Sequence, residues 1–414
     1  MEDAIHNPNH TFPPVESGEK KTSKLPQNPV PGYQGGWRIF TLMGIPVFVS
    51  PGVFLIILVI GLSLAGDFFP EKYSSSGYGS AVFIAMGAAG AVFFFISILI
   101  HEIAHCILAR FNNVPVRRIS MFILGGMSEM AHEPRTAGSE FAIALAGPAA
   151  SLALGGALWS AFFALEALQA PLYVLGVVYF VGLMNIILGL TNLLPGFPLD
   201  GGRILRALIW LKTRNSLRAT RIAGITGRVL GYAGIGTGMV FMLAGGFKGA
   251  FFQGMFLVMA GMFVARGARE SYEQALLRKA LEDVRVADIM HTEIPSVWEE
   301  LNIAEVVPGY FLRYSVDAFP VVDHLGRLRG MLTSQMLRRL PGGPRAHLKV
   351  KHIMAADVLP PVCRPEEKAD ELYVSMTRYR TPAMAVVGPD GELAGAIMMS
   401  DILRAAHIRK QFVR

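Results

Sequence analysis

Six long apolar runs constrain this chain more than any other feature of its sequence. Each is close to or above the ~20 residues that a helix needs to cross a ~30 Å hydrocarbon layer. Only 17% of the residues are charged, and the mean hydropathy is +0.43, which is too apolar for an ordinary soluble protein. We therefore expect an α-helical polytopic membrane protein with about six transmembrane helices in the lipid bilayer. The runs lie near residues 45–65, 80–109, 138–165, 172–194, 221–246 and 249–266.

The basic residues predict the orientation of these helices. The formal net charge is +7, and Lys and Arg flank the apolar runs in the way that the positive-inside rule expects of cytosolic loops. Arg110, Arg117 and Arg118 follow the second run, and a group from Arg203 to Arg221 follows the fourth. This distribution favours a multi-pass protein of the cell membrane with a cytosolic N-terminus and C-terminal region. It argues against a nucleic-acid partner.

Composition divides the chain into four regions. Residues 1–36 are rich in Pro, Asn, Lys and Gly without apolar periodicity, which predicts a disordered tail. Residues 37–270 hold the apolar runs, residues 271–283 are expected to form a linker helix, and residues 284–414 have the composition of a soluble α/β domain.

The C-terminal region contains an internal repeat. Val286–Met290 in the first copy corresponds to Val350–Met354 in the second, at a spacing of about 65 residues. Each copy is expected to form a short strand, a helix, two β-branched strands around a turn and a closing helix. The copies, at 284–341 and 348–410, should together form one compact cytosolic module.

The second apolar run ends in the pattern HEIAH, at His101–His105. On a helix, residues i and i+4 share a face about 6 Å apart, so His101 and His105 can bind one Zn²⁺ while Glu102 reaches a metal-bound water. Arg110 marks the expected membrane boundary, so His101 lies ~14 Å inside it. Ionisable groups at this depth are costly and typically functional. The alternative is a helix end whose polar residues approach the lipid headgroups.

A catalytic zinc site usually has three protein ligands, so a third must come from another segment. Asp200 is the best candidate, because it follows the sequence NLLPGFPL at 192–199, where prolines and glycine end the fourth run. Irregular backbone at membrane depth is tolerated only beside protein or a water-filled cavity. The alternative is that Asp200 only caps a helix beginning at Gly201 or Gly202.

Three further features are expected to have structural roles or are left open. Cys106 points about 100° away from His105 on a helix, so we interpret it as a packing residue. Gly147 and Pro148 are expected to serve helix packing. Residues 119–130 are expected to form either a short hairpin, whose open edge can add a substrate strand, or a loop at the membrane surface.

These motifs resemble the site-2 protease family of intramembrane zinc metalloproteases, in the subgroup with a C-terminal pair of cystathionine-β-synthase-type (CBS) domains. HEIAH matches the family's HExxH, and NLLPGFPLDGGR at 192–203 matches its N-x-x-P-x-x-P-x-D-G motif. The resemblance covers roughly residues 37–410, including Gly125-Gly126 and Ala146-Gly147-Pro148.

The resemblance implies one Zn²⁺ per chain, with His101, His105 and Asp200 as ligands and Glu102 as general base. It also implies Asn192 as a polar stabiliser of the substrate carbonyl or oxyanion. The implied substrate is a transmembrane protein, which must unwind locally to expose its peptide bonds. Related members often carry Asn where Ser151 stands, so no role is carried over to Ser151.

CBS pairs often bind adenine nucleotides through a Thr and an Asp spaced as G-h-h-[TS]-x-x-D. The first copy has Thr333 but Met336 in place of the Asp, and the second has Asp401 but Met398 in place of the Thr. Nucleotide sensing therefore stays open beside homodimerisation or substrate gating.

Two other functions compete with the protease. A transporter or channel regulated by its CBS pair would also explain charged residues inside the membrane. It would not explain the HExxH spacing together with a separate Asp, and no inverted repeat is evident. The second alternative is a membrane scaffold that has lost catalysis, and the intact Glu102 argues against it.

Overall fold

A computed structural model describes most of the chain, which divides into two compact units, Gly32–Ala275 and Leu276–Arg414. The structure describes residues 36–123, 125–244, 250–293, 295–314, 316–325, 327–338, 348–354, 362–379, 381–389 and 392–411. The tail that was expected to be disordered, residues 1–36, lies outside these ranges apart from Gly36.

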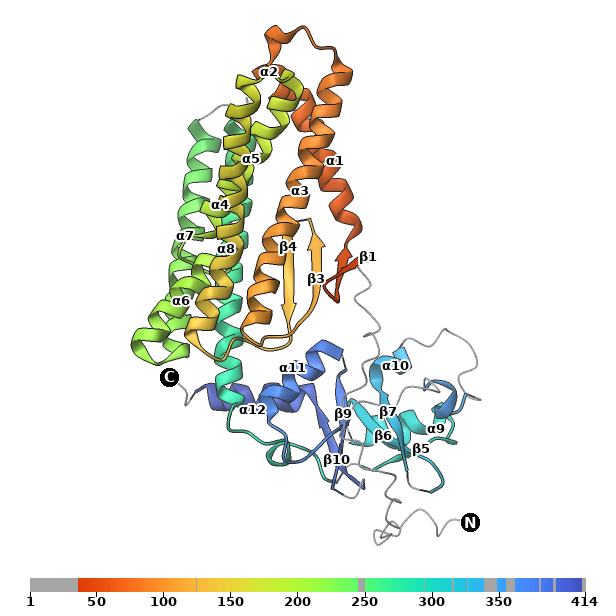
Figure 1. Cartoon of the computed structure of the whole chain (residues 1–414). Helices are drawn as coiled ribbons and strands as arrows, with labels where there is room; N and C mark the ends of the chain where they lie inside the picture. Colours follow the sequence, from red (N-terminus) through yellow and green to blue (C-terminus); the bar gives the residue numbers. More distant parts are fainter. Residues whose placement is uncertain are drawn as a thin grey trace, which may run out of the picture. The chain divides into compact units, whose positions relative to one another are not determined.

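Six helices of the described residues are long and apolar enough to cross a membrane, which confirms the polytopic class. They carry many exposed apolar side chains because lipid, not protein, surrounds them. The first continues from α1 (Pro51–Ser63) through a π-helical turn into α2 (Phe69–Lys72). The others are α3 (Ser80–Phe111), α4 (Ala137–Ala167), α5 (Leu172–Asn192), α7 (Ser216–Ala244) and α8 (Ala250–Leu281) (Figure 1).

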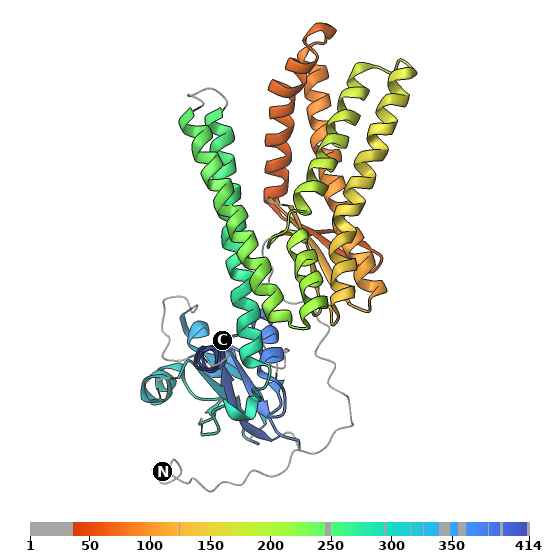
Figure 2. The same cartoon turned by 90° about the vertical axis from the view of Figure 1, so that its left-hand side faces the viewer.

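Helix α6 (Asp200–Thr213) is shorter and amphipathic, and it joins α5 to α7. It packs against both α4 and α7. Figure 2 shows α7 and α8 side by side as a helical hairpin. Helix α8 continues without a break to Leu281, so its last turns occupy most of the segment expected to be a linker helix.

A four-stranded sheet completes the membrane unit. Its order is β1-β2-β3-β4, with antiparallel pairs at both ends and a parallel pair between β2 and β3. The hairpin expected at 119–130 is therefore present, and β4 is an edge strand of this sheet. The strands are β1 (Trp37–Leu42), β2 (Ile45–Val49), β3 (Val116–Phe122) and β4 (Gly125–Met130).

The expectation that the first span begins near residue 45 is wrong. Residues Ile45–Val49 form β2, and the helix begins only at Pro51. Ile45 and Val47 are buried on one face of the sheet, as the two-residue period of a strand requires. Pro51 then sits in the first helical turn, where its missing N–H costs nothing. Hydropathy alone does not separate a buried strand from the helix that follows it.

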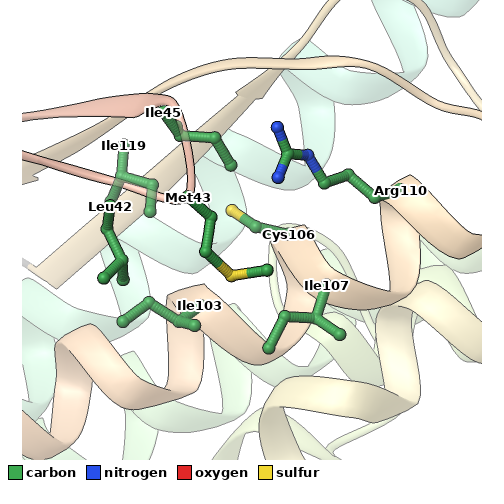
Figure 3. A pocket seen from close by; sticks show the side chains of 8 residues that line it. All are labelled: Leu42, Met43, Ile45, Ile103, Cys106, Ile107, Arg110 and Ile119. Atoms are coloured by element: carbon green, nitrogen blue, oxygen red, sulfur yellow. The ribbon is translucent and has the colours of Figure 1, made fainter.

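The turn between β1 and β2 packs against α3 close to the HEIAH motif. Figure 3 shows the side chains around a small pocket at this contact, with Met43 between Ile103 and Cys106. This packing places the sheet along the helix that carries His101 and His105. The lining residues are Leu42, Met43, Ile45, Ile103, Cys106, Ile107, Arg110 and Ile119.

The C-terminal unit contains the two expected copies, each with its own three-stranded sheet. In both, a two-residue strand pairs in parallel with the next strand, which pairs antiparallel with the third. Asp390 and Gly391 of the second copy's turn lie outside the described residues. The strands are β5 (Val297–Trp298), β6 (Ala318–Val322), β7 (Leu328–Thr333), β8 (Val362–Cys363), β9 (Ala383–Val387) and β10 (Leu393–Met398). The helices are α9 (Ile303–Val306), α10 (Ser334–Arg338), α11 (Ala369–Tyr379) and α12 (Met399–Lys410).

Candidate metal centre

Helix α3 brings the two histidines of HEIAH together. His101 and His105 are one turn apart and buried, and their Nε2 atoms are 3.2 Å from each other. Both rings lie near the end of a long apolar helix that contacts α1, α4 and α5. The spacing expected from the sequence therefore produces a converging pair of imidazoles.

Helix α4 orients both rings through their other nitrogen. The Nδ1 of His105 lies 2.7 Å from the backbone oxygen of Ile143, and the Nδ1 of His101 lies 2.9 Å from Oγ of Ser151. A carbonyl oxygen only accepts, so Nδ1 of His105 carries the proton and Nε2 keeps its lone pair for a metal. Ser151, to which the family resemblance assigned no role, thus orients His101.

Asp200 is the first residue of α6, and Leu199 occupies the N-cap position. The interpretation of Asp200 as a simple helix cap is therefore wrong. Its Oδ2 lies 3.2 Å from Nε2 of His101 and 3.3 Å from Nε2 of His105. The loop before α6 makes tight turns, including the hydrogen bonds from Leu199 N to the Gly196 carbonyl and from Gly202 N to the Leu199 carbonyl.

The three donor atoms have the spacing of a tetrahedral zinc site. Ligands about 2.0–2.1 Å from Zn²⁺ in tetrahedral geometry are about 3.3 Å from one another, and the three separations here are 3.2, 3.2 and 3.3 Å. All three residues come from the membrane unit, and they form the one His, Cys, Asp or Glu cluster of this kind among the described residues.

Gly147 keeps the space between these donors open. A Cβ at this position would lie 2.2 Å from Nε2 of His105 and 2.6 Å from Nε2 of His101. Any side chain would therefore occupy the volume in which a metal ion would be bound. Gly147 thus allows the close packing of α4 on α3 that was expected of it and also leaves room between the donors, and the donor set and this space together fit a zinc ion.

Strand β4 contacts the remaining member of the motif, Glu102. The hydroxyl of Ser128 donates to Oε2 of Glu102 at 2.7 Å, and a Cβ on Gly126 would lie 2.4 Å from Cγ of Glu102. The Cys106 thiol donates to Oγ of Ser128 at 3.3 Å, and its side chain is buried among apolar residues of the sheet and α3, as a packing role requires.

The other expected site residues lie elsewhere. Asn192 ends α5, and its Nδ2 donates to the carbonyl of Leu188 in the same helix. In the C-terminal unit, Thr333 Oγ1 accepts from the Met336 amide. Asp401 Oδ2 accepts from the Met398 amide, and its Oδ1 lies 3.1 Å from Nε2 of His291.

The contacts of four further residues with the HEIAH motif were not predicted from the sequence, and these residues share a simple spacing. Gly147 and Ser151 are four residues apart on α4, so both meet the histidine face of α3. Gly126 and Ser128 are two residues apart on β4, so both face Glu102. This spacing becomes informative only once the contact partner of each element is known.

Comparisons with known proteins show the family to which this chain is similar. The model of Peptidase family M50 matches residues 89–169 and 166–234, and the CBS domain model matches residues 286–342 and 350–408. The putative zinc metalloprotease Rip3 of Mycobacterium tuberculosis is 33% identical over 328 residues, which are 79% of this chain and 82% of the relative. A putative zinc metalloprotease of Synechocystis is 27% identical and covers 89% of this chain and 94% of the relative.

A solved structure is also similar. The site-2 protease of Methanocaldococcus jannaschii is 28% identical, with a TM-score of 0.39, and the match covers 57% of this chain and 95% of that one.

The fold and the site define a polytopic membrane metalloprotease. The chain belongs to peptidase family M50 and is an intramembrane zinc protease of the site-2 type with a CBS domain pair. This membership decides against a transporter or channel regulated by its CBS pair.

Proposed function

We propose that the chain is an endopeptidase that cuts peptide bonds of transmembrane proteins, with one Zn²⁺ held by His101, His105 and Asp200. The observation that carries this proposal is the convergence of three donor atoms from two segments, all 3.2–3.3 Å apart. Glu102 lies next to His101 in the sequence, where it serves as general base.

The zinc ion would supply Lewis acidity, which acidifies water and polarises the scissile carbonyl. Glu102 takes a proton from water while the water oxygen bonds to the carbonyl carbon, and it then returns the proton to the amine nitrogen as the C–N bond breaks. Water is consumed, and a carboxyl and an amine group are formed. The Ser128 hydroxyl donates to Oε2 of Glu102, which leaves Oε1 to accept the proton.

Asn192 is proposed to stabilise the negative charge on the substrate oxygen. Its side chain is half-buried at the end of α5, eight positions before Asp200. One amide hydrogen is donated to the Leu188 carbonyl. A primary amide carries two N–H groups, so the second is available to a substrate oxygen.

The edge of β4 is the proposed docking position for the substrate. Backbone groups released from an unwound helix need hydrogen-bond partners away from bulk water, and an edge strand supplies them by adding the substrate as a further strand. Strand β4 ends the four-stranded sheet and contacts Glu102 through Gly126 and Ser128. This contact brings a docked segment close to the general base.

The test compares membranes of cells that express wild type, Glu102→Gln or a control. Glu166→Gln is a matched control, because it makes the same change at an exposed acidic residue near the far end of α4. Quantitative mass spectrometry should find one or more uncut membrane proteins that accumulate only with Glu102→Gln. Equal levels of every membrane protein in all three samples would contradict the proposal.

The CBS pair is proposed to regulate this activity by binding an adenine nucleotide near Thr333 and Asp401. Both side chains are buried and already accept backbone hydrogen bonds, and Asp401 also pairs with His291. A nucleotide would therefore compete with His291 for the carboxylate. Thermal shift and calorimetry of the full chain with ATP, ADP and AMP test this, and absence of any response to all three would contradict it.

Two properties of the assembly complete the proposal. The CBS pair associates with a second copy to form a homodimer, which light scattering of the purified chain would show as twice the monomer mass. The N-terminus and the CBS pair face the cytosol, as the basic loops indicate. Protease protection of an epitope tag at each end, in sealed vesicles of known orientation, tests this placement.

A further inference from the structure

A buried ion pair joins α6 to α4 at some distance from the metal centre. The Nε of Arg206 donates to Oε1 of Glu140 at 2.6 Å, and its terminal nitrogens lie 3.4 Å from Oε2 of Glu133. Glu140 is completely buried and Arg206 is 11% exposed. Within the described part of the chain, Oε2 of Glu140 has no hydrogen-bond partner, so the hydrogen bonds of its carboxylate go to Arg206 alone.

Arg206 also contacts the loop that presents Asp200. Its guanidinium lies over the ring of Phe197, with 5.9 Å between Cζ and the ring centroid. Phe197 is buried three residues before Asp200, and its amide donates to the carbonyl of Ala223 in α7. One side chain therefore touches both α4 and the segment from which the third donor of the metal centre extends.

The ion pair and the metal centre lie at two ends of one helix contact. Asp200 precedes Arg206 by six positions on α6, and Gly147 follows Glu140 by seven on α4. At 1.5 Å per residue these separations are about 9 Å and about 10 Å. Since Asp200 and Gly147 both lie beside the imidazoles, the two helices run antiparallel with matched spacing.

Fold stability alone is a weak reason for such a pair. Desolvation of two charges can cancel their attraction, so a buried ion pair often adds little net stability, while it does fix one arrangement of its neighbours. Helix α6 is short, and its carboxylate must stay within hydrogen-bonding distance of two rings on another helix. A directional contact to α4 meets that requirement.

We propose that Arg206 and Glu140 are positioning residues that hold α6 against α4 and so keep the Asp200 carboxylate at ligand distance from His101 and His105. This inference rests on the proposed metal centre. It assigns to the pair a role in metal affinity, without contact to the metal or the substrate. Breaking the pair should weaken metal binding through Asp200 and leave the two histidines as they are.

The test is a Co²⁺ titration of the full-length, metal-free chain in nanodiscs, followed by the visible absorption of the bound ion. Arg206→Met and Glu140→Gln should each lower the Co²⁺ affinity about tenfold, at the lower end of the range for outer-sphere partners of metal ligands. Both should also change the Co²⁺ spectrum. Arg118→Met is the matched control, because it breaks another 2.6 Å ion pair, with Glu129 in the sheet.

The same substitution in a chain that already lacks the Asp200 carboxylate separates a positioning role from general destabilisation of the fold. In Asp200→Ala, whose residual affinity comes from the two histidines, Arg206→Met should cause no further loss. An equal tenfold loss in that background, or unchanged affinity in both single variants, would overturn the inference. If Arg206→Met does not accumulate, the nearly isosteric Glu140→Gln serves for the same comparison. Wild type that binds no Co²⁺ would instead refute the metal centre itself.

Discussion

Ser128 on strand β4 donates a hydrogen bond of 2.7 Å to Oε2 of Glu102 on helix α3. The same hydroxyl accepts from the thiol of Cys106, one turn further along α3. A serine hydroxyl has one hydrogen to donate, so the contact from Cys106 leaves that hydrogen for Glu102. Glu102, the proposed general base, is thus oriented by the strand that is also the proposed docking edge.

Replacing Ser128 should therefore impair the chemical step more than binding. Ser128→Ala removes one hydrogen bond to a charged group, worth about 1.5 kcal/mol, so kcat should fall about tenfold with KM and zinc content unchanged. Ser128→Thr should keep most of the rate. The assay uses a membrane protein that accumulates with Glu102→Gln, reconstituted in proteoliposomes. A kcat equal to that of Ser160→Ala, a control on α4, would contradict the role of Ser128.

Gly147 supports a prediction about metal content. Gly147→Ala places a methyl group 2.2 Å from Nε2 of His105, so the purified chain should retain little zinc and no activity while still inserting into membranes. Gly156→Ala, on the same helix, is the matched control, because its Cβ would meet open space. Zinc is measured by elemental analysis. Full zinc occupancy in Gly147→Ala would show that α4 can move away from the rings.

The membrane class and the donor set could be predicted because each rests on a local pattern. Apolar runs of membrane length and the four-residue spacing of His101 and His105 need no knowledge of neighbours. Asp200 could be singled out because prolines and glycines end an apolar run just before it. The C-terminal copies were visible for a similar reason, since a repeat is a comparison of the sequence with itself.

The remaining parts depend on which surfaces meet. Strand β2 was predicted as part of a helix because hydropathy does not distinguish a buried strand from a membrane helix. Gly147 and Ser151 look like ordinary residues of an apolar helix until α4 is placed beside the imidazoles. Ser128 and Gly126 similarly acquire a role only from the packing of β4 on α3.

The edge of β4 supports a prediction about substrate docking. Met130 is the last residue of this strand, and its backbone N–H faces the open edge, because the next amide, that of Ala131, donates to the Pro115 carbonyl on the β3 side. Met130→Pro removes this backbone donor from the edge, so cleavage should fall at least tenfold if the substrate adds to this edge. Met130→Ala, which keeps the donor, should cleave normally.

Two further measurements make the proline result specific. Zinc content should be unchanged in Met130→Pro, because the donors lie on α3 and α6. Hydrogen exchange of residues 116–122 should also match wild type, which shows that β3 remains paired. Normal cleavage by a Met130→Pro chain with an intact sheet would place the substrate elsewhere.

Cys363 supports a pH-dependent prediction in the C-terminal unit. Burial on strand β8 raises the pKa of its thiol to about 12. Only the thiolate reacts with alkylating reagents, so at pH 8 the reactive fraction is about 10⁻⁴, and it should rise about tenfold with each pH unit while the fold persists. Iodoacetamide at pH 8 should therefore leave Cys363 unmodified, as mass spectrometry of the full chain would show. Its neighbour Val362 is 42% exposed, so the double variant Cys363→Ser/Val362→Cys supplies a control thiol that should react readily. Equal labelling of Cys363 in the wild type and of the control thiol would contradict the prediction, because it would show that the strand opens on the timescale of the reaction.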